Sequence, residues 1–103
     1  MNRITLLALG LGFCLAAQAA DPITLGLNYP RTGSYKEEGL AQMRGALLAI
    51  DEINQAGGVL GRPLQLISRN TASRPDKAIA NVDKMADEGV AMLFGGVSSA
   101  VAI

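Results

Sequence analysis

The sequence contains no histidine and no tryptophan, and it has a single cysteine. Histidine is the commonest general base near neutral pH and the commonest metal ligand, so its absence argues against a hydrolytic or metal centre. With two Phe and two Tyr, a core must be built from Leu, Ile, Val, Met and Ala. The chain also lacks an excess of either charge, since nine acidic residues balance nine basic ones. This balance is typical of a globular unit and not of a nucleic-acid-binding chain.

The only long hydrophobic run lies at the start of the chain, over residues 4–17. It follows Arg3 and leads into the small-x-small tripeptide at residues 17–19. We therefore predict a signal peptide over residues 1–19, cleaved after Ala19. A membrane anchor is the alternative, but a spanning helix needs roughly 20 apolar residues. Cys14 lies inside the predicted signal, so the mature part would hold no disulfide, thiolate nucleophile or cysteine-based metal site.

Beyond the signal, short apolar runs alternate with helical patterns. Strands are predicted at residues 23–29, 64–68 and 91–94. The first helix is predicted from about Glu37 to the pair Gly57-Gly58, with an apolar stripe at spacings of three and four. The stripe consists of Leu40, Met43, Leu47, Ile50 and Ile53.

A second helix is predicted to begin with Ser73 as its cap and Pro75 in its first turn, and to end at Gly89. Its expected buried stripe has Met85 alongside, and Asn81 is placed on another face. That stripe consists of Ile79, Val82 and Ala86.

The predicted order of elements is strand, helix, strand, helix, strand and the start of a further helix. Helices of ten or more residues between short strands indicate parallel pairing through right-handed crossovers. The expected fold class is therefore α/β, with a Rossmann-like parallel sheet. Such a sheet needs helices on both faces, which two complete helices cannot supply. We expect residues 20–103 to be the amino-terminal part of a larger domain.

The third strand runs into what we call the serine turn, residues 95–99. Gly95 and Gly96 allow the backbone to turn tightly, and Ser98 or Ser99 is a natural helix cap. The free N–H groups of a helix start attract anions such as a carboxylate. The turn is therefore a candidate site for a small anionic group. The alternative is an ordinary strand-to-helix turn with a serine cap.

Residues 51–64, DEINQAGGVLGRPL, resemble the first helix-to-strand joint of the type I periplasmic binding proteins. Within that group the chain is most similar to the branched-chain amino acid (leucine/isoleucine/valine) binding proteins of ABC importers. The serine turn, Gly45 and the motifs at residues 32–34 and 75–78 support the resemblance.

The resemblance implies two Rossmann-like lobes that close on a ligand, with residues 20–103 forming the first part of lobe one. In relatives that bind amino acids, a serine of the turn after the third strand holds the α-carboxylate. That position corresponds to Ser99, with Ser98 adjacent. Independently, open α/β sheets bind ligands at the carboxyl ends of strands beside a topological switch point. With strand order two-one-three, these ends are the first loop (residues 30–36) and the serine turn.

The first loop departs from the small, neutral loop of many relatives because it carries Arg31, Tyr35 and Lys36. Arg31 could bind an acidic group, and Tyr35 could stack over a ligand. The alternative is that these are solvated charges and a half-buried ring, which we favour for Lys36. The ligand class therefore stays open among amino acids, amides, urea-like compounds and aromatic acids.

These features predict a periplasmic solute-binding protein that captures a small polar solute, such as an amino acid or amide, and delivers it to an ABC permease. The alternative is a ligand-sensing module of a receptor or regulator with the same fold. An enzyme is disfavoured because the chain has no G-x-S-x-G elbow, P-loop or paired-carboxylate pattern. We expect no cofactor, no metal and no nucleic-acid partner.

Overall fold

The structure is a computed structural model that describes residues 20–102. The predicted signal peptide, including Cys14, lies outside the described residues. Along the described chain the elements are β1 (Ile23–Tyr29), α2 (Lys36–Gln55), β2 (Leu64–Asn70), α3 (Pro75–Asp87), β3 (Met92–Gly95) and α4 (Ser99–Ala102). No helix within residues 20–102 combines the length and the apolar character that crossing a bilayer requires.

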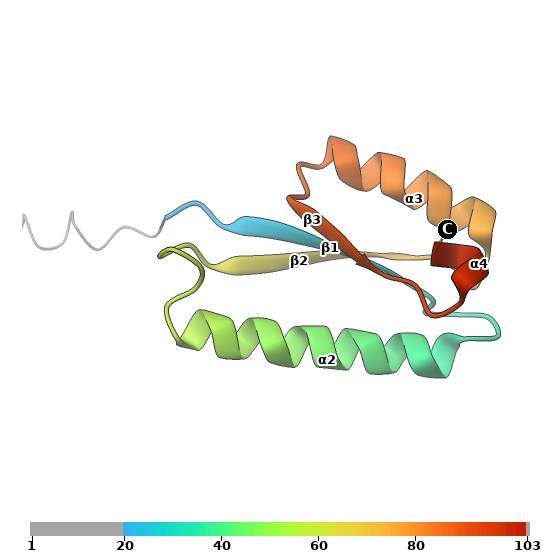
Figure 1. Ribbon diagram of the computed structural model, residues 1–103, viewed down its shortest axis with the longest axis horizontal. Helices are drawn as coiled ribbons and strands as arrows, with labels where there is room; N and C mark the ends of the chain where they lie inside the picture. The colour runs from blue at the N-terminus through green and yellow to red at the C-terminus, as the bar shows by residue number, and fades with distance from the viewer. Residues whose placement is uncertain (1–19, 103) are drawn as a thin grey trace, which may run out of the picture.

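The three strands form one parallel sheet in the order β2-β1-β3. β1 pairs with β2 from Ile23↔Leu64 to Tyr29↔Asn70, and with β3 from Leu25↔Met92 to Asn28↔Gly95. Helix α2 lies on one face of the sheet and α3 on the other (Figure 1). The predicted α/β class, parallel pairing and strand order are confirmed.

The core is centred on β1, the middle strand, where Leu27 is fully buried and Tyr29 nearly so. Side chains alternate between the two faces of a strand, so these two residues share one face and Gly26 and Asn28 share the other. On that second face α3 approaches closely. A Cβ atom at Gly26 would lie only 3.0 Å from the sulfur of Met85.

The buried face of α3 differs from the predicted stripe. Ala78, Asn81 and Met85 are buried, whereas Ile79 is 61% exposed and Val82 is 42% exposed. The prediction was therefore wrong for all three residues of the stripe, since Ala86 is exposed too, and for Asn81. Hydrophobic periodicity cannot identify a buried amide whose polar atoms are satisfied inside the protein.

Asn81 is buried because its amide has such partners. Its Nδ2 donates to Asn28 Oδ1 and to the Asn70 carbonyl, both at 3.0 Å. Asn28 in turn donates to the carbonyl of Ala78, also at 3.0 Å. These bonds join α3 to the carboxyl-terminal halves of β1 and β2. They therefore anchor the helix next to the edge of the sheet where the candidate site lies.

The stripe predicted on α2 is only partly covered by the described residues. Leu40, Met43 and Ile50 are half-buried, whereas Leu47 and Ile53 are exposed. The single buried residue of α2 is Gly39, in its first turn. Helix α2 therefore packs most closely near its amino terminus, beside the first loop.

Candidate functional site

Loops that follow the three strands gather at one edge of the sheet. β1 leads into the first loop, β2 into the second loop (residues 71–74) and β3 into the serine turn. Because parallel strands end at the same edge, these connections neighbour one another (Figure 1). The structure therefore brings the two predicted regions to adjacent strand ends.

The serine turn needs its glycines for two reasons. Gly95 and Gly96 have φ angles of 121° and 89°, in the region that disfavours a side chain. A Cβ at Gly95 would lie 2.2 Å from the carbonyl oxygen of Asn28. That same oxygen accepts a hydrogen bond from the Gly96 N–H at 3.1 Å. The predicted tight turn is confirmed, and it is packed against the end of β1.

Ser98 and Ser99 have different environments within the turn. Ser98 is half-buried, and its Oγ accepts a hydrogen bond from the Ala100 N–H at 3.3 Å. Ser98 therefore provides the predicted helix cap. Ser99 is the first residue of α4 and is exposed at the carboxyl edge of the sheet. Its hydroxyl is the more accessible of the two to a ligand above that edge.

Gln42 lies on α2, on the face of the sheet opposite α3, and contacts the serine turn from there (Figure 1). Its Nε2 donates to the Gly96 carbonyl at 3.2 Å. Its Oε1 is buried and has no hydrogen-bond partner among the described residues. Gln42 is not part of the apolar stripe predicted for this helix, and this contact was not identified from the sequence. A long-range amide-to-backbone bond leaves no local signal in the sequence.

Arg31 and Tyr35 both lie in the first loop. The Arg31 guanidinium carbon is 5.8 Å from the centre of the Tyr29 ring, within the range of a cation–π contact. Tyr35 occupies the position before the first residue of α2, and its side chain is 40% exposed. Both side chains are accessible at the predicted edge, as is Lys36. Their roles as ligand contacts stay predictions.

The hydrogen bonds of the first loop lead to the second loop, an arrangement that the sequence did not predict. Ser73 was expected to cap α3, but the residue before that helix is Arg74, and no side-chain cap is present. The Ser73 hydroxyl instead bonds to the backbone of the first loop. The strand order alone could have indicated this contact, because β1 and β2 are neighbours in the sheet and the loops that follow them therefore lie side by side.

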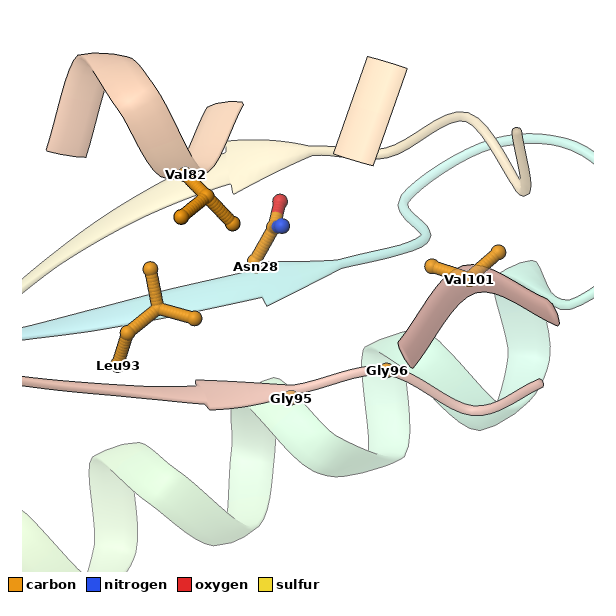
Figure 2. Close-up of a pocket in the computed structure, with 6 residues that line it drawn as sticks. All are labelled: Asn28, Val82, Leu93, Gly95, Gly96 and Val101. Carbon is orange, nitrogen blue, oxygen red and sulfur yellow. The ribbon is translucent and has the colours of Figure 1, made fainter. Parts of the chain in front are cut away.

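A small hollow lies between α3, β3 and α4 (Figure 2). Its volume is about 80 Å³, well below the roughly 300–1,000 Å³ of typical ligand pockets. None of the four predicted site residues lines it. The hollow is lined by Asn28, Val82, Leu93, Gly95, Gly96 and Val101. It lies on the α3 face of the sheet and borders the two glycines of the serine turn, without reaching Ser98, Ser99 or the first loop.

Charged residues near the second loop form surface ion pairs. Arg74 and Asp76 are both exposed and lie 2.7 Å apart, and Arg69 pairs with Glu88. The hydrogen bond donated by Arg74 lowers the pKa of the Asp76 carboxyl. Within residues 20–102, no group of three or more His, Cys, Asp or Glu residues is placed to hold a metal ion.

A parallel sheet of order β2-β1-β3 with loops gathered at its carboxyl edge defines the beginning of a doubly wound α/β ligand-binding fold. The chain belongs to the periplasmic binding protein family, whose model matches residues 22–103. This confirms the resemblance drawn from the sequence.

Among curated relatives, a leucine-, isoleucine-, valine-, threonine- and alanine-binding protein of Pseudomonas aeruginosa is 40% identical over 85% of this chain and 24% of its own length. The chain thus spans about a quarter of the length of the relatives it matches.

Two solved structures show the same architecture. The branched-chain amino acid transporter substrate binding protein LivJ of Streptococcus pneumoniae, in complex with isoleucine, has a TM-score of 0.74 at 29% identity, covering 80% of this chain and 24% of its own. A fatty acid ABC transporter substrate-binding protein of Thermomonospora curvata has a TM-score of 0.72 at 27% identity, covering 80% of this chain and 21% of its own. Proteins named for very different ligands thus share this part of the fold.

Proposed function

We propose that residues 20–103 form the amino-terminal part of the first lobe of a solute-binding protein of an ABC importer, exported by a signal peptide over residues 1–19. The protein would capture an amino acid or amide in a cleft between two lobes and deliver it to a membrane permease. The observation that carries this proposal is the serine turn, which presents the exposed Ser99 at the carboxyl edge of a parallel sheet, where the neighbouring strand leads into the first loop. The amino acids named for the relatives support the ligand class.

Ser99 would hold the ligand's carboxylate through its hydroxyl, with Ser98 adjacent. Hydrogen bonds to a charged group are about twice as strong as bonds between neutral groups, so even one or two would orient the ligand. Contacts from the second lobe would then favour the closed state, because only that state makes both sets of contacts. This role needs binding without a chemical step, so the protein would not be an enzyme.

Arg31 and Tyr35 would form the second part of the wall on this lobe. Their side chains are larger and more polar than those of a small, neutral loop, which favours a solute that offers an acidic or planar group. The Arg31 guanidinium would favour an acidic ligand over a neutral one. The ligand need not be a plain aliphatic amino acid.

The proposal is tested on the full-length protein by thermal shift and titration calorimetry with amino acids, acetamide, urea and small organic acids. Ser99→Leu should lower the affinity for the best-binding ligand by about tenfold or more, because it removes the hydroxyl and fills the space above the turn. Ala49→Leu adds similar bulk on the exposed face of α2 and should leave affinity unchanged. Unchanged affinity in a folded Ser99→Leu protein would refute the carboxylate role.

A further inference from the structure

We propose that Asn70 and Ser73 are positioning residues that hold the first loop in its ligand-binding shape. The inference rests on the proposed function, because it concerns the loop that carries Arg31 and Tyr35. Neither residue needs to touch the ligand. Both act from the neighbouring β2 end, through hydrogen bonds to the first loop.

Ser73 fixes the first loop at two separated points. Its Oγ accepts a hydrogen bond from the Tyr35 N–H at 3.1 Å and donates one to the Thr32 carbonyl at 3.0 Å. One hydroxyl therefore bridges the two ends of a four-residue segment of the first loop, from Thr32 to Tyr35. This sets where the backbone of Tyr35 sits at the start of α2.

Asn70 joins the two loops through a single side chain. Its Oδ1 accepts hydrogen bonds from the N–H groups of Arg31 and Ala72, each at 2.8 Å. Its Nδ2 donates to the Thr32 hydroxyl at 3.0 Å. The second residue of each loop, Arg31 and Ala72, is thus held by the same carboxamide, and Arg31 is the residue predicted to meet the ligand.

The second loop adopts an unfavourable backbone to make these contacts. Ala72 and Ser73 have φ angles of 53° and 58°, which residues with a Cβ rarely adopt. Such conformations persist where surrounding contacts determine them, and they cluster at functional sites. The two loops are also in close contact, since a Cβ at Gly33 would lie 2.7 Å from Ser73 Oγ and 2.8 Å from the Ala72 carbonyl.

A purely structural role for Ser73 would be to cap α3, which follows the second loop. The structure shows no side-chain cap on that helix. The hydroxyl is used entirely on the first loop, so its removal should affect that loop and leave α3 in place. This difference makes the proposal separable from a general loss of stability.

The sharpest test compares Ser73→Gly with Ala72→Gly in the full-length protein. Both substitutions remove a Cβ from a left-handed residue, so both relieve the same backbone strain, but only Ser73→Gly removes the hydroxyl. Ser73→Gly should raise the dissociation constant for L-isoleucine, or for the panel amino acid that binds best, by about tenfold. Ala72→Gly should leave it within about twofold. Equal affinities in the two variants would overturn the proposal.

Hydrogen exchange measured by mass spectrometry supplies a readout that needs no ligand. Peptides covering the first loop should exchange faster in Ser73→Gly than in Ala72→Gly, while peptides from α3 exchange alike in both. If the unmodified protein binds none of the panel, the proposed function fails, and exchange still decides whether Ser73 holds the loop. Unaltered exchange in the first loop would contradict the inference on its own.

Asn70 allows a conservative rescue. Asn70→Asp keeps the oxygen that accepts from Arg31 and Ala72, whereas Asn70→Ala removes it. Asn70→Asp should keep the ligand affinity within about threefold of the unmodified protein, and hydrogen exchange in the first loop should stay as slow as before. Asn70→Ala should lower the affinity about tenfold. Equal losses for the two variants would show that the oxygen does not position the loop.

Discussion

At the residue scale, the structure depends on buried amides as well as on apolar packing. Asn28 and Asn81 are only 6% and 5% exposed, and they bond to each other and to backbone carbonyls. A buried polar group is tolerated when it is hydrogen-bonded, and removing one partner leaves the other unsatisfied. Asn81 is therefore a structural residue of the sheet–helix contact beside the candidate site.

We predict that Asn81→Ala destabilises the protein by about 1–3 kcal/mol, because Asn28 Oδ1 and the Asn70 carbonyl lose their donor. Asp83→Ala, an exposed acidic position on the same helix, should change stability by about 0.5 kcal/mol or less. Thermal or urea unfolding of the full-length protein measures both. An Asn81→Ala protein as stable as Asp83→Ala would show that the amide cluster contributes little.

Single residues also show what the sequence could and could not predict. The turn at Gly95 and Gly96 and the serine cap were predictable, because glycine conformation and capping are local properties. The burial of Asn81 and the bonds made by Ser73 were not. They depend on partners tens of residues away in the chain, which the strand order brings together.

At the element scale, α2 is placed against the sheet by its first turn. Gly39 is buried there, and its N–H bonds to the Tyr35 carbonyl at 3.0 Å. A Cβ at Gly39 would overlap the carbonyl oxygen of Pro30, only 1.8 Å away. Gly45, further along the same helix, has nothing within 4 Å of its Cβ position. The first glycine is needed for close approach to the first loop, whereas the second is not needed for packing within the described residues.

The two glycines give opposite predictions for the same substitution. Gly45→Ala should stabilise the protein by about 0.5–1 kcal/mol, because alanine is the better helix former. Gly39→Ala should lower the free energy of unfolding by about 2 kcal/mol or more, since the backbone must move to admit the methyl group. Thermal unfolding distinguishes the two. A stable Gly39→Ala protein with unchanged ligand affinity would mean that α2 and the first loop can separate without consequence.

The bounds of the elements illustrate a further limit of sequence patterns. β1 was predicted over its observed residues, because its apolar run is dense and ends at Pro30. β2 continues two residues beyond the predicted end at Ser68, through Arg69 and Asn70. Those residues are polar but pair with β1 up to Tyr29↔Asn70. Pairing with a neighbouring strand, which the sequence does not display, extends the strand and brings Asn70 to the first loop.

At the scale of the whole molecule, the parallel sheet and its strand order determine where a ligand can bind. The parallel sheet was predictable from helices alternating with short strands, whereas the strand order was assumed from the sequence and is given by the structure. The three-dimensional structure was needed to find the hydrogen bonds between the first and second loops. It was also needed to find the hollow beside β3. The chain spans about a quarter of its relatives' length, and in the proposed two-lobe protein the facing wall of the cleft would come from sequence outside these residues.

The most direct test of the central claim is a crystal structure of the full-length protein with the best-binding amino acid of the panel bound. A carboxylate oxygen of the ligand is expected within about 2.7–3.1 Å of the Ser99 hydroxyl or of a backbone N–H of the serine turn. The first loop is expected to keep its hydrogen bonds to Asn70 and Ser73. A carboxylate bound away from the carboxyl edge of β1 and β3 would contradict the proposed binding site.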